Sequence, residues 1–313
     1  MVGFLIGFLL AALGALLLYA GGEFLVRNAS HLARVMGMSA LTVGLTVVAL
    51  GTSSPELATS VAAALEGSPG TALGNVVGSN SANMGLVLGL TALLYPLRTR
   101  VSFLRREVPF MIATGALLTL LVAIGALGSA AGLLLVLLLV AYLWALLGGA
   151  AAEPLQTEEA DEGGPKPVGV SLAGVALGVV LLVAGAYSLV EGALDLARAL
   201  EVPERVIGLT LVALGGSLPE LGGTLVAPLR RQGDLALGNL VGSNILNVLF
   251  VLGTTVLVRP LFVSPGAFAL DLLVMLGLST LALPLLLTGR RLGRREGAAL
   301  LATYLAYVSF LYG

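Results

Sequence analysis

Ten apolar runs, each long enough to cross the hydrocarbon core of a membrane, dominate this 313-residue sequence. A spanning helix needs about 20 consecutive apolar residues, because the bilayer interior is ~30 Å thick. Short polar breaks separate the runs, which cover residues 2–26, 41–65, 71–96, 107–127, 130–149, 169–194, 205–229, 235–258, 265–288 and 296–312. The chain is therefore predicted to be an all-α integral membrane protein with ten transmembrane helices.

Composition narrows the possible partners of such a chain. Hydrophobic residues make up 58% of the sequence and charged residues 11%, so the lipid bilayer is the expected surrounding. A net charge of -1 indicates no basic surface for nucleic acid. The chain has no cysteine, and its single histidine, His31, leaves no His/Cys cluster for zinc or iron. No cofactor is expected, and no protein partner is evident.

The second half of the sequence repeats the first at a distance of 164 residues. At this offset "GTSSPE" (51–56) falls on "GGSLPE" (215–220), and "GNVVGSNSANMGLVLG" (74–89) falls on "GNLVGSNILNVLFVLG" (238–253). Each repeat holds five predicted helices, so the second copy must cross the membrane in the opposite sense. Inverted-topology repeats of this kind are typical of secondary transporters, which bind substrates near the midplane.

An acidic segment rich in glycine and proline separates the repeats. It predicts a first five-helix repeat over 1–149, a linker over 150–168 and a second, inverted repeat over 169–313. All but three of the 16 basic residues (Arg198, Arg205 and Arg259) follow odd-numbered helices. Because cytoplasmic loops collect Lys and Arg, the linker is expected in the cytoplasm and both termini outside.

Helices 2 and 7 are predicted to be broken where the repeated motif places glycine and proline in mid-helix. Proline removes a backbone hydrogen bond, which frees carbonyl oxygens around 49–52 and 213–216. Such irregular backbone is tolerated in a membrane where it is buried in protein or lines a cavity. One turn later stand Glu56 and Glu220. A charge at this depth costs at least ~2.5–3.5 kcal/mol, so the two glutamates imply a function.

The donor atoms near these breaks are all oxygens. Besides the two glutamates, the candidates are Thr52, Ser53, Ser79, Asn83, Ser217, Ser243 and Asn247. The serine and asparagine of helix 3 are four residues apart, as are those of helix 8, so each pair projects from one side of its helix. An oxygen set without sulfur or imidazole predicts a site for a hard cation, Ca²⁺ or Na⁺.

These motifs resemble those of the cation/calcium exchanger superfamily, specifically prokaryotic sodium/calcium exchangers, over essentially the whole chain. The resemblance implies that Glu56 and Glu220 bind both Ca²⁺ and Na⁺, and that carbonyls near Thr52 and Gly216 complete the calcium site. It implies further sodium ligands, namely the hydroxyls of Ser53, Ser79, Ser217 and Ser243 and the backbone oxygens of Ala49 and Ala213. It also implies a prokaryotic inner-membrane location, with long helices 1 and 6 sliding against the other eight.

Two positions depart from the family pattern. Gly216 stands where a threonine is common, so a ligand there has to be the backbone carbonyl. Asn247 stands where several relatives, including the potassium-dependent exchangers, have aspartate. The site therefore holds two carboxylates and no third.

The expected function is secondary antiport of Ca²⁺ against Na⁺ by alternating access, and the alternative is Ca²⁺/H⁺ antiport through the same glutamates. A channel is disfavoured, because enclosed carboxylates between inverted repeats suit alternating access better. An intramembrane hydrolase would need Ser53 or Ser54 as nucleophile together with a base. His31 is expected in a cytoplasmic loop and no lysine lies at the midplane, so the chain is not expected to be an enzyme.

Overall fold

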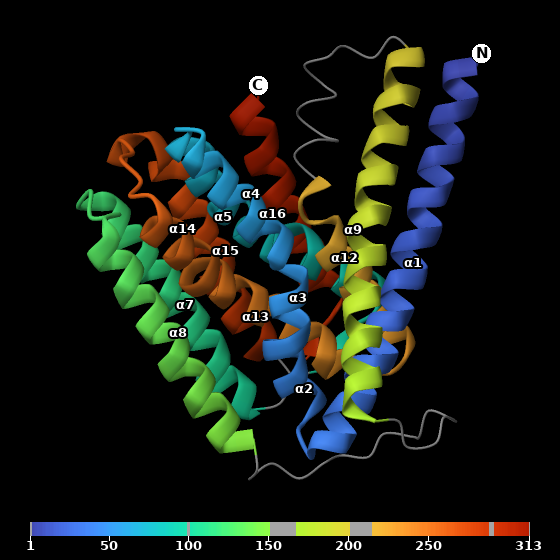
Figure 1. The fold of residues 1–313 in the computed structure, drawn as a ribbon, viewed down its shortest axis with the longest axis horizontal. Helices are drawn as coiled ribbons and strands as arrows, with labels where there is room; N and C mark the ends of the chain where they lie inside the picture. The colour runs from blue at the N-terminus through green and yellow to red at the C-terminus, as the bar shows by residue number, and fades with distance from the viewer. Residues whose placement is uncertain (1, 99–100, 151–166, 201–214, 288–290, 313) are drawn as a thin grey trace.

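The computed structural model describes residues 2–98, 101–150, 167–200, 215–287 and 291–312, and these residues are mostly helical (Figure 1). The helices of the first half are α1 (Val2–Met36), α2 (Ala40–Val43), α3 (Ala49–Thr52), α4 (Ser54–Leu65), α5 (Pro69–Ala82), α6 (Leu88–Leu94), α7 (Val101–Ala123) and α8 (Ser129–Ala150). Those of the second half are α9 (Val168–Ala199), α12 (Leu218–Leu229), α13 (Gly233–Leu246), α14 (Gly253–Val258), α15 (Ala269–Leu287) and α16 (Arg294–Tyr312).

Shorter elements connect several of these helices. Wider π-helical turns link α2 to α3, α5 to α6 and α13 to α14, and they are η1 (Gly44–Val48), η2 (Asn83–Val87) and η4 (Asn247–Leu252). A 3-10 turn, η5 (Pro265–Phe268), precedes α15. Strands β1 (Leu97–Arg98) and β2 (Arg291–Leu292) pair antiparallel, with Leu97 opposite Leu292.

The length and hydropathy of the described helices indicate an integral membrane protein. Seven of them are long and apolar enough to cross a membrane, or up to eight if the bent pair Ala40–Thr52 and Ser54–Leu65 forms one span. The first part of the seventh expected span, 205–229, lies outside the described residues. Most of the expected linker, 150–168, lies outside them too. Ten spans, inverted repeats, the limits of the two halves and the direction of insertion therefore stay predictions.

Helix α1 is longer than the apolar run that marks it in the sequence. The run ends near residue 26, whereas the helix continues to Met36 and stops before Gly37, whose φ is +66°. The residues of this extension include polar ones, which can form a helix but end an apolar run in the sequence. His31 consequently lies in α1 and not in a loop, where it was expected. It is buried, with Nδ1 2.8 Å from the hydroxyl of Ser171 on α9.

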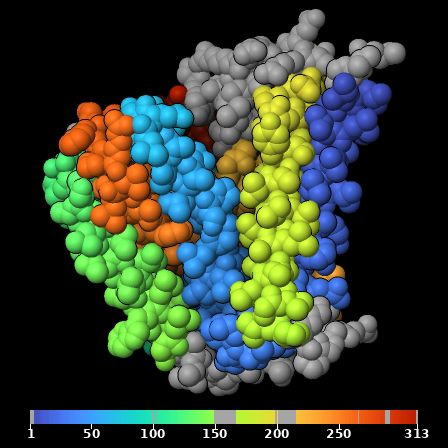
Figure 2. Space-filling model, viewed as in Figure 1, coloured from blue at the N-terminus to red at the C-terminus, as the bar shows by residue number. Residues whose placement is uncertain are grey.

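A seam of glycines joins α1 to α9 along most of their length. Each helix has three glycines spaced seven residues, or about two turns, apart. The glycines of α1 face those of α9 in the pairs Gly7 and Gly192, Gly14 and Gly185, and Gly21 and Gly178. A Cβ added to Gly14 would lie 2.3 Å from the backbone nitrogen of Leu189. The two helices run antiparallel at one edge of the molecule, opposite α8 (Figures 1 and 2). Small residues allow this close approach, as they commonly do between membrane helices.

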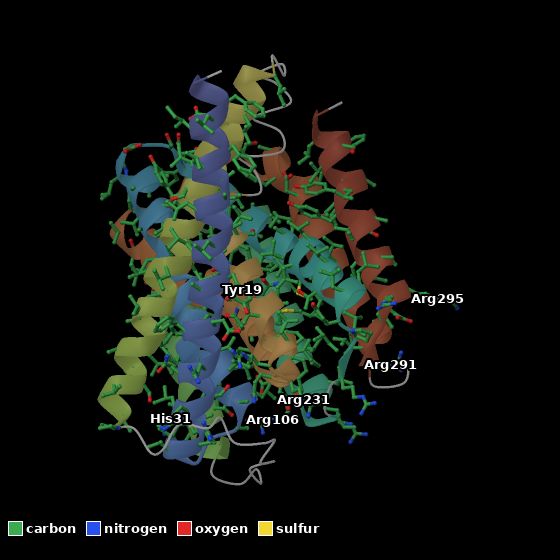
Figure 3. The ribbon with its side chains drawn as sticks, turned by 90° about the vertical axis from the view of Figure 1, so that its right-hand side faces the viewer. Tyr19, His31, Arg106, Arg231, Arg291 and Arg295 are labelled. Carbon is green, nitrogen blue, oxygen red and sulfur yellow. The ribbon has the colours of Figure 1, made fainter. Side chains whose placement is uncertain are left out.

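The main hydrophobic core lies away from this pair. Its buried side chains come from α2 to α8 and α13 to α16, with none from α1 or α9 among the described residues. A smaller cluster, including Leu25, Leu182 and Val226, joins α1 and α9 to α12. Figure 3 shows Arg106 and Arg231 near the level of His31.

Candidate cation-binding site

The first broken helix bends by 42° between α3 and α4, with Ser53 at the break. Pro55 follows in the first turn of α4 and has no N–H for the carbonyl of Gly51, four residues earlier. The expected release of carbonyls is not complete, because the Ser53 amide donates to the Ala49 oxygen at 2.9 Å. The same oxygen also lies 3.4 Å from the Thr52 hydroxyl, which can donate to it, so the role of Ala49 as a ligand stays a prediction.

The second break is described from Gly215 onward. Ser217 precedes α12 with φ -96° and ψ 4°, close to the φ -84° and ψ 0° of Ser53 before α4. Pro219 lies in the first turn of α12, as Pro55 does in α4. Ala213 lies outside the described residues, so its role as a sodium ligand stays a prediction.

Two π-helical turns begin at the predicted site asparagines. Asn83 is the first residue of η2, and Asn247 is the first residue of η4. Both side chains are fully buried. Such turns are rare and occur often at functional sites, because the extra residue widens the helix. Here they widen α5–α6 and α13–α14 at the same place in each repeat.

Most of the buried side-chain atoms without a hydrogen-bond partner belong to the predicted site residues. In the described part of the chain, nine buried side-chain polar atoms have no hydrogen-bond partner, and seven of these belong to predicted site residues. The seven are the hydroxyl of Ser53, both carboxylate oxygens of Glu56 and of Glu220, and the amide oxygens of Asn83 and Asn247. Buried polar atoms are normally hydrogen-bonded, since leaving one unpaired costs ~1–3 kcal/mol. Bound cations would satisfy oxygens of this kind.

The two glutamates come from the two halves of the chain and meet in the interior. Glu56 is 4% exposed and Glu220 1%, and their carboxyl groups lie within interaction distance of each other. The described residues place no arginine against either carboxylate. Two carboxylates repel each other unless a cation or a proton lies between them.

Thr52 connects the first break to the second half. Its hydroxyl donates to Asn239 Oδ1 at 3.1 Å and lies 3.3 Å from the hydroxyl of Ser243, both on α13. At the equivalent position Gly216 is exposed, and a Cβ added there would meet no described atom within 4 Å. Within the described ranges, side-chain hydrogen bonds to α13 are therefore found on the Thr52 side and not on the Gly216 side.

The remaining predicted residues are buried in the same region. Ser79 and Ser217 are 7% and 3% exposed, and the backbone oxygen of Ser79 accepts from the backbone N–H of Asn83. Ala49 contacts α13, because a Cβ added to Gly242 would lie 2.9 Å from the Ala49 Cβ.

Four further asparagines contact the site and were not singled out from the sequence. Asn75 Nδ2 donates to the Glu56 carbonyl at 3.1 Å, and Asn239 accepts from Thr52. Asn80 and Asn244 bind the side chains of Asn247 and Asn83 respectively. All four occur in the repeated "GN" and "GSN" motifs, so the repeat itself was the signal that could have identified them.

Comparison with known proteins agrees with this fold. The solved sodium-calcium exchanger NCX_Mj, soaked with 10 mM Na⁺ and zero Ca²⁺, superposes with a TM-score of 0.83 at 32% identity, over 98% of this chain and 99% of that one. CaxA of Alkalimonas amylolytica, whose name gives antiport as a suggested activity, is 37% identical over 98% of this chain and 99% of its own. The sodium/calcium exchanger MaX1 of Methanosarcina acetivorans is 33% identical over 98% and 99%.

Long apolar helices around a buried oxygen site, with this structural likeness, define an integral membrane exchanger of cations including Ca²⁺. The sequence model described as sodium/calcium exchanger protein matches residues 6–148 and 170–313. The chain belongs to that family, as its motifs led us to expect. Its relatives are transporters, which agrees with the expectation that it is not an enzyme.

Proposed function

We propose that the chain is a secondary antiporter that exchanges Ca²⁺ for Na⁺ by alternating access, with the ions held between Glu56 and Glu220. The observation that carries this proposal is that seven of the nine buried, unpaired side-chain atoms in the described residues belong to predicted site residues. The two carboxylates supply two negative charges, which balance one Ca²⁺ or two Na⁺. The neutral oxygens of Ser53, Asn83 and Asn247 add ligands without adding charge, which suits a site that has to release its ion.

Ca²⁺/H⁺ antiport is the second candidate, because two glutamates buried without a hydrogen-bond partner among the described residues could be neutralised by protons as well as by cations. A proton bound to either carboxylate would remove one of the two negative charges, as a cation would balance them. Both mechanisms use the same glutamates, so the driving ion has to be identified by transport.

Radioactive calcium uptake into proteoliposomes under separate Na⁺, K⁺ and pH gradients tests the proposal. We expect an outward Na⁺ gradient to drive uptake whether or not K⁺ is present, because two carboxylates already balance Ca²⁺ and the site has no third acid to hold K⁺. A requirement for K⁺ would contradict the charge argument. Uptake driven by a pH gradient and indifferent to Na⁺ would establish proton coupling in its place.

We propose that α1 and α9 move together as one unit during alternating access. Their mutual contact is close along the glycine seam, whereas the main hydrophobic core, as far as its residues are described, holds no side chain of either helix. A pair that holds together tightly and touches the remaining helices through a smaller cluster can slide without disrupting the site.

The Thr52 hydroxyl is expected to stabilise the site and not to bind the ion, because it already donates to Asn239. Thr52→Ala should lower the free energy of unfolding by ~1–3 kcal/mol, since it leaves the buried Asn239 oxygen unpaired. The Ca²⁺ concentration for half-maximal uptake should change less than about threefold, because the backbone carbonyl remains. Thr59→Ala, at an exposed position of α4, is the matched control and should change neither quantity. A large loss of Ca²⁺ affinity with unchanged stability would show that the hydroxyl is a ligand.

A further inference from the structure

Four asparagines from the two halves of the chain form a closed set of hydrogen bonds at the site. Asn80 Nδ2 donates to the Asn244 carbonyl at 3.2 Å, and Asn244 Nδ2 donates to the Asn80 carbonyl at 3.3 Å. Asn83 Nδ2 donates to Asn244 Oδ1 at 3.1 Å, and Asn247 Nδ2 donates to Asn80 Oδ1 at 3.0 Å. The first half of the chain therefore makes the same two hydrogen bonds to the second half as the second half makes to the first.

This arrangement decides which way the amides of Asn83 and Asn247 point. An amide carries its nitrogen and oxygen on opposite sides of one carbon, so fixing the nitrogen also fixes the oxygen. Both nitrogens are held by a side-chain oxygen of the opposite half. Both oxygens are buried and have no partner among the described residues.

We propose that Asn80 and Asn244 are positioning residues that turn the amide oxygens of Asn247 and Asn83 toward the transported cation. This inference rests on the proposed function, because it takes the unpaired oxygens to be cation ligands. Each positioning residue acts through a site residue of the other half, so it links the two halves at the ion.

The chemistry of asparagine suits this role. Asn80 and Asn244 each have to donate to a backbone carbonyl and accept from an amide at the same time, and both are almost fully buried. Aspartate offers acceptors alone, and leucine offers neither. If Asn244 served only to pack the helices together, its effect on Ca²⁺ binding would not depend on Asn83.

A double-mutant cycle on purified, detergent-solubilised protein separates these two roles, because coupled residues give non-additive effects. Equilibrium binding of Ca²⁺ is measured in the absence of Na⁺ for the wild type, Asn83→Ala, Asn244→Ala and the double variant. We expect each single variant to raise the dissociation constant about tenfold, and the double variant to match Asn83→Ala. Independent effects that multiply to about a hundredfold would overturn the proposal, as would unchanged binding by Asn244→Ala.

Asn239→Ala provides the matched control on the same helix. Asn239 is a buried asparagine of α13 that bonds to Thr52 and Thr224 and not to Asn83, so its effect should multiply with that of Asn83→Ala. If Asn244→Ala does not fold, the equivalent cycle with Asn80→Ala and Asn247→Ala tests the same claim. If neither Asn244→Ala nor Asn80→Ala folds, the proposal is contradicted, and the two asparagines have a structural role.

The same measurement distinguishes this inference from the proposed function. A wild-type chain that binds no Ca²⁺ would contradict the proposed function itself. A wild-type chain that binds Ca²⁺, with independent effects of Asn83 and Asn244, would contradict the positioning role alone.

Discussion

Glu56→Gln and Glu220→Gln are each expected to reduce calcium uptake at least about a hundredfold in proteoliposomes. One remaining carboxylate leaves a bound Ca²⁺ with an uncompensated positive charge in a buried site, and breaking a buried charge pair costs ~3–5 kcal/mol. Glutamine keeps the shape of the side chain, so packing around both buried positions is retained. The measurement is the initial rate of radioactive calcium uptake under a fixed Na⁺ gradient.

Stability measurements separate loss of the ion from loss of the fold. In the absence of Ca²⁺ and Na⁺, each glutamine variant should be at least as stable as the wild type, because the repulsion between two buried carboxylates is removed. Added Ca²⁺ should raise the melting temperature of the wild type and not that of either variant. Glu66→Gln changes an exposed glutamate just after α4 and should leave uptake normal. Normal uptake by Glu56→Gln or Glu220→Gln would remove the proposed site.

Gly14→Ala is expected to destabilise the protein and to abolish transport. The added methyl would lie 2.3 Å from the backbone nitrogen of Leu189 and 2.7 Å from its Cβ, and a backbone cannot rotate away as a flexible side chain can. The α1–α9 pair has to separate, which costs at least ~1–3 kcal/mol by overpacking and weakens the contacts on both sides of the seam. Thermal unfolding in detergent and calcium uptake are the two measurements.

Gly169→Ala is the matched control for the seam, because this glycine of α9 is exposed and an added Cβ would meet no described atom within 4 Å. It should retain wild-type stability and uptake. Gly192→Ala should resemble Gly14→Ala, because its Cβ would lie 2.3 Å from the Ala11 nitrogen on the opposite helix. Wild-type behaviour of both seam variants would show that α1 and α9 do not depend on this close contact.

Local chemistry explains which features of the protein could be predicted without a structure. The length of an apolar run and the missing N–H of Pro55 are properties of short segments, so a membrane protein with a broken helix follows from them directly. The 164-residue repeat then pairs Glu56 with Glu220 as candidate ligands. The end of α1 could not be predicted from hydropathy, because helix propensity continues through polar residues until Gly37.

The atoms that meet inside the protein were decided by the crossing of helices from the two halves. Sequence alone identified Asn83 and Thr52 as residues with oxygen atoms that could bind a cation, because the residue type fixes the chemical groups of a side chain. It could not show that the Thr52 hydroxyl is bound to Asn239, or that Asn244 holds the Asn83 amide and leaves its oxygen unpaired. Those hydrogen bonds join residues more than 160 positions apart, and their partners depend on helix position and rotation, which no local pattern in the chain encodes.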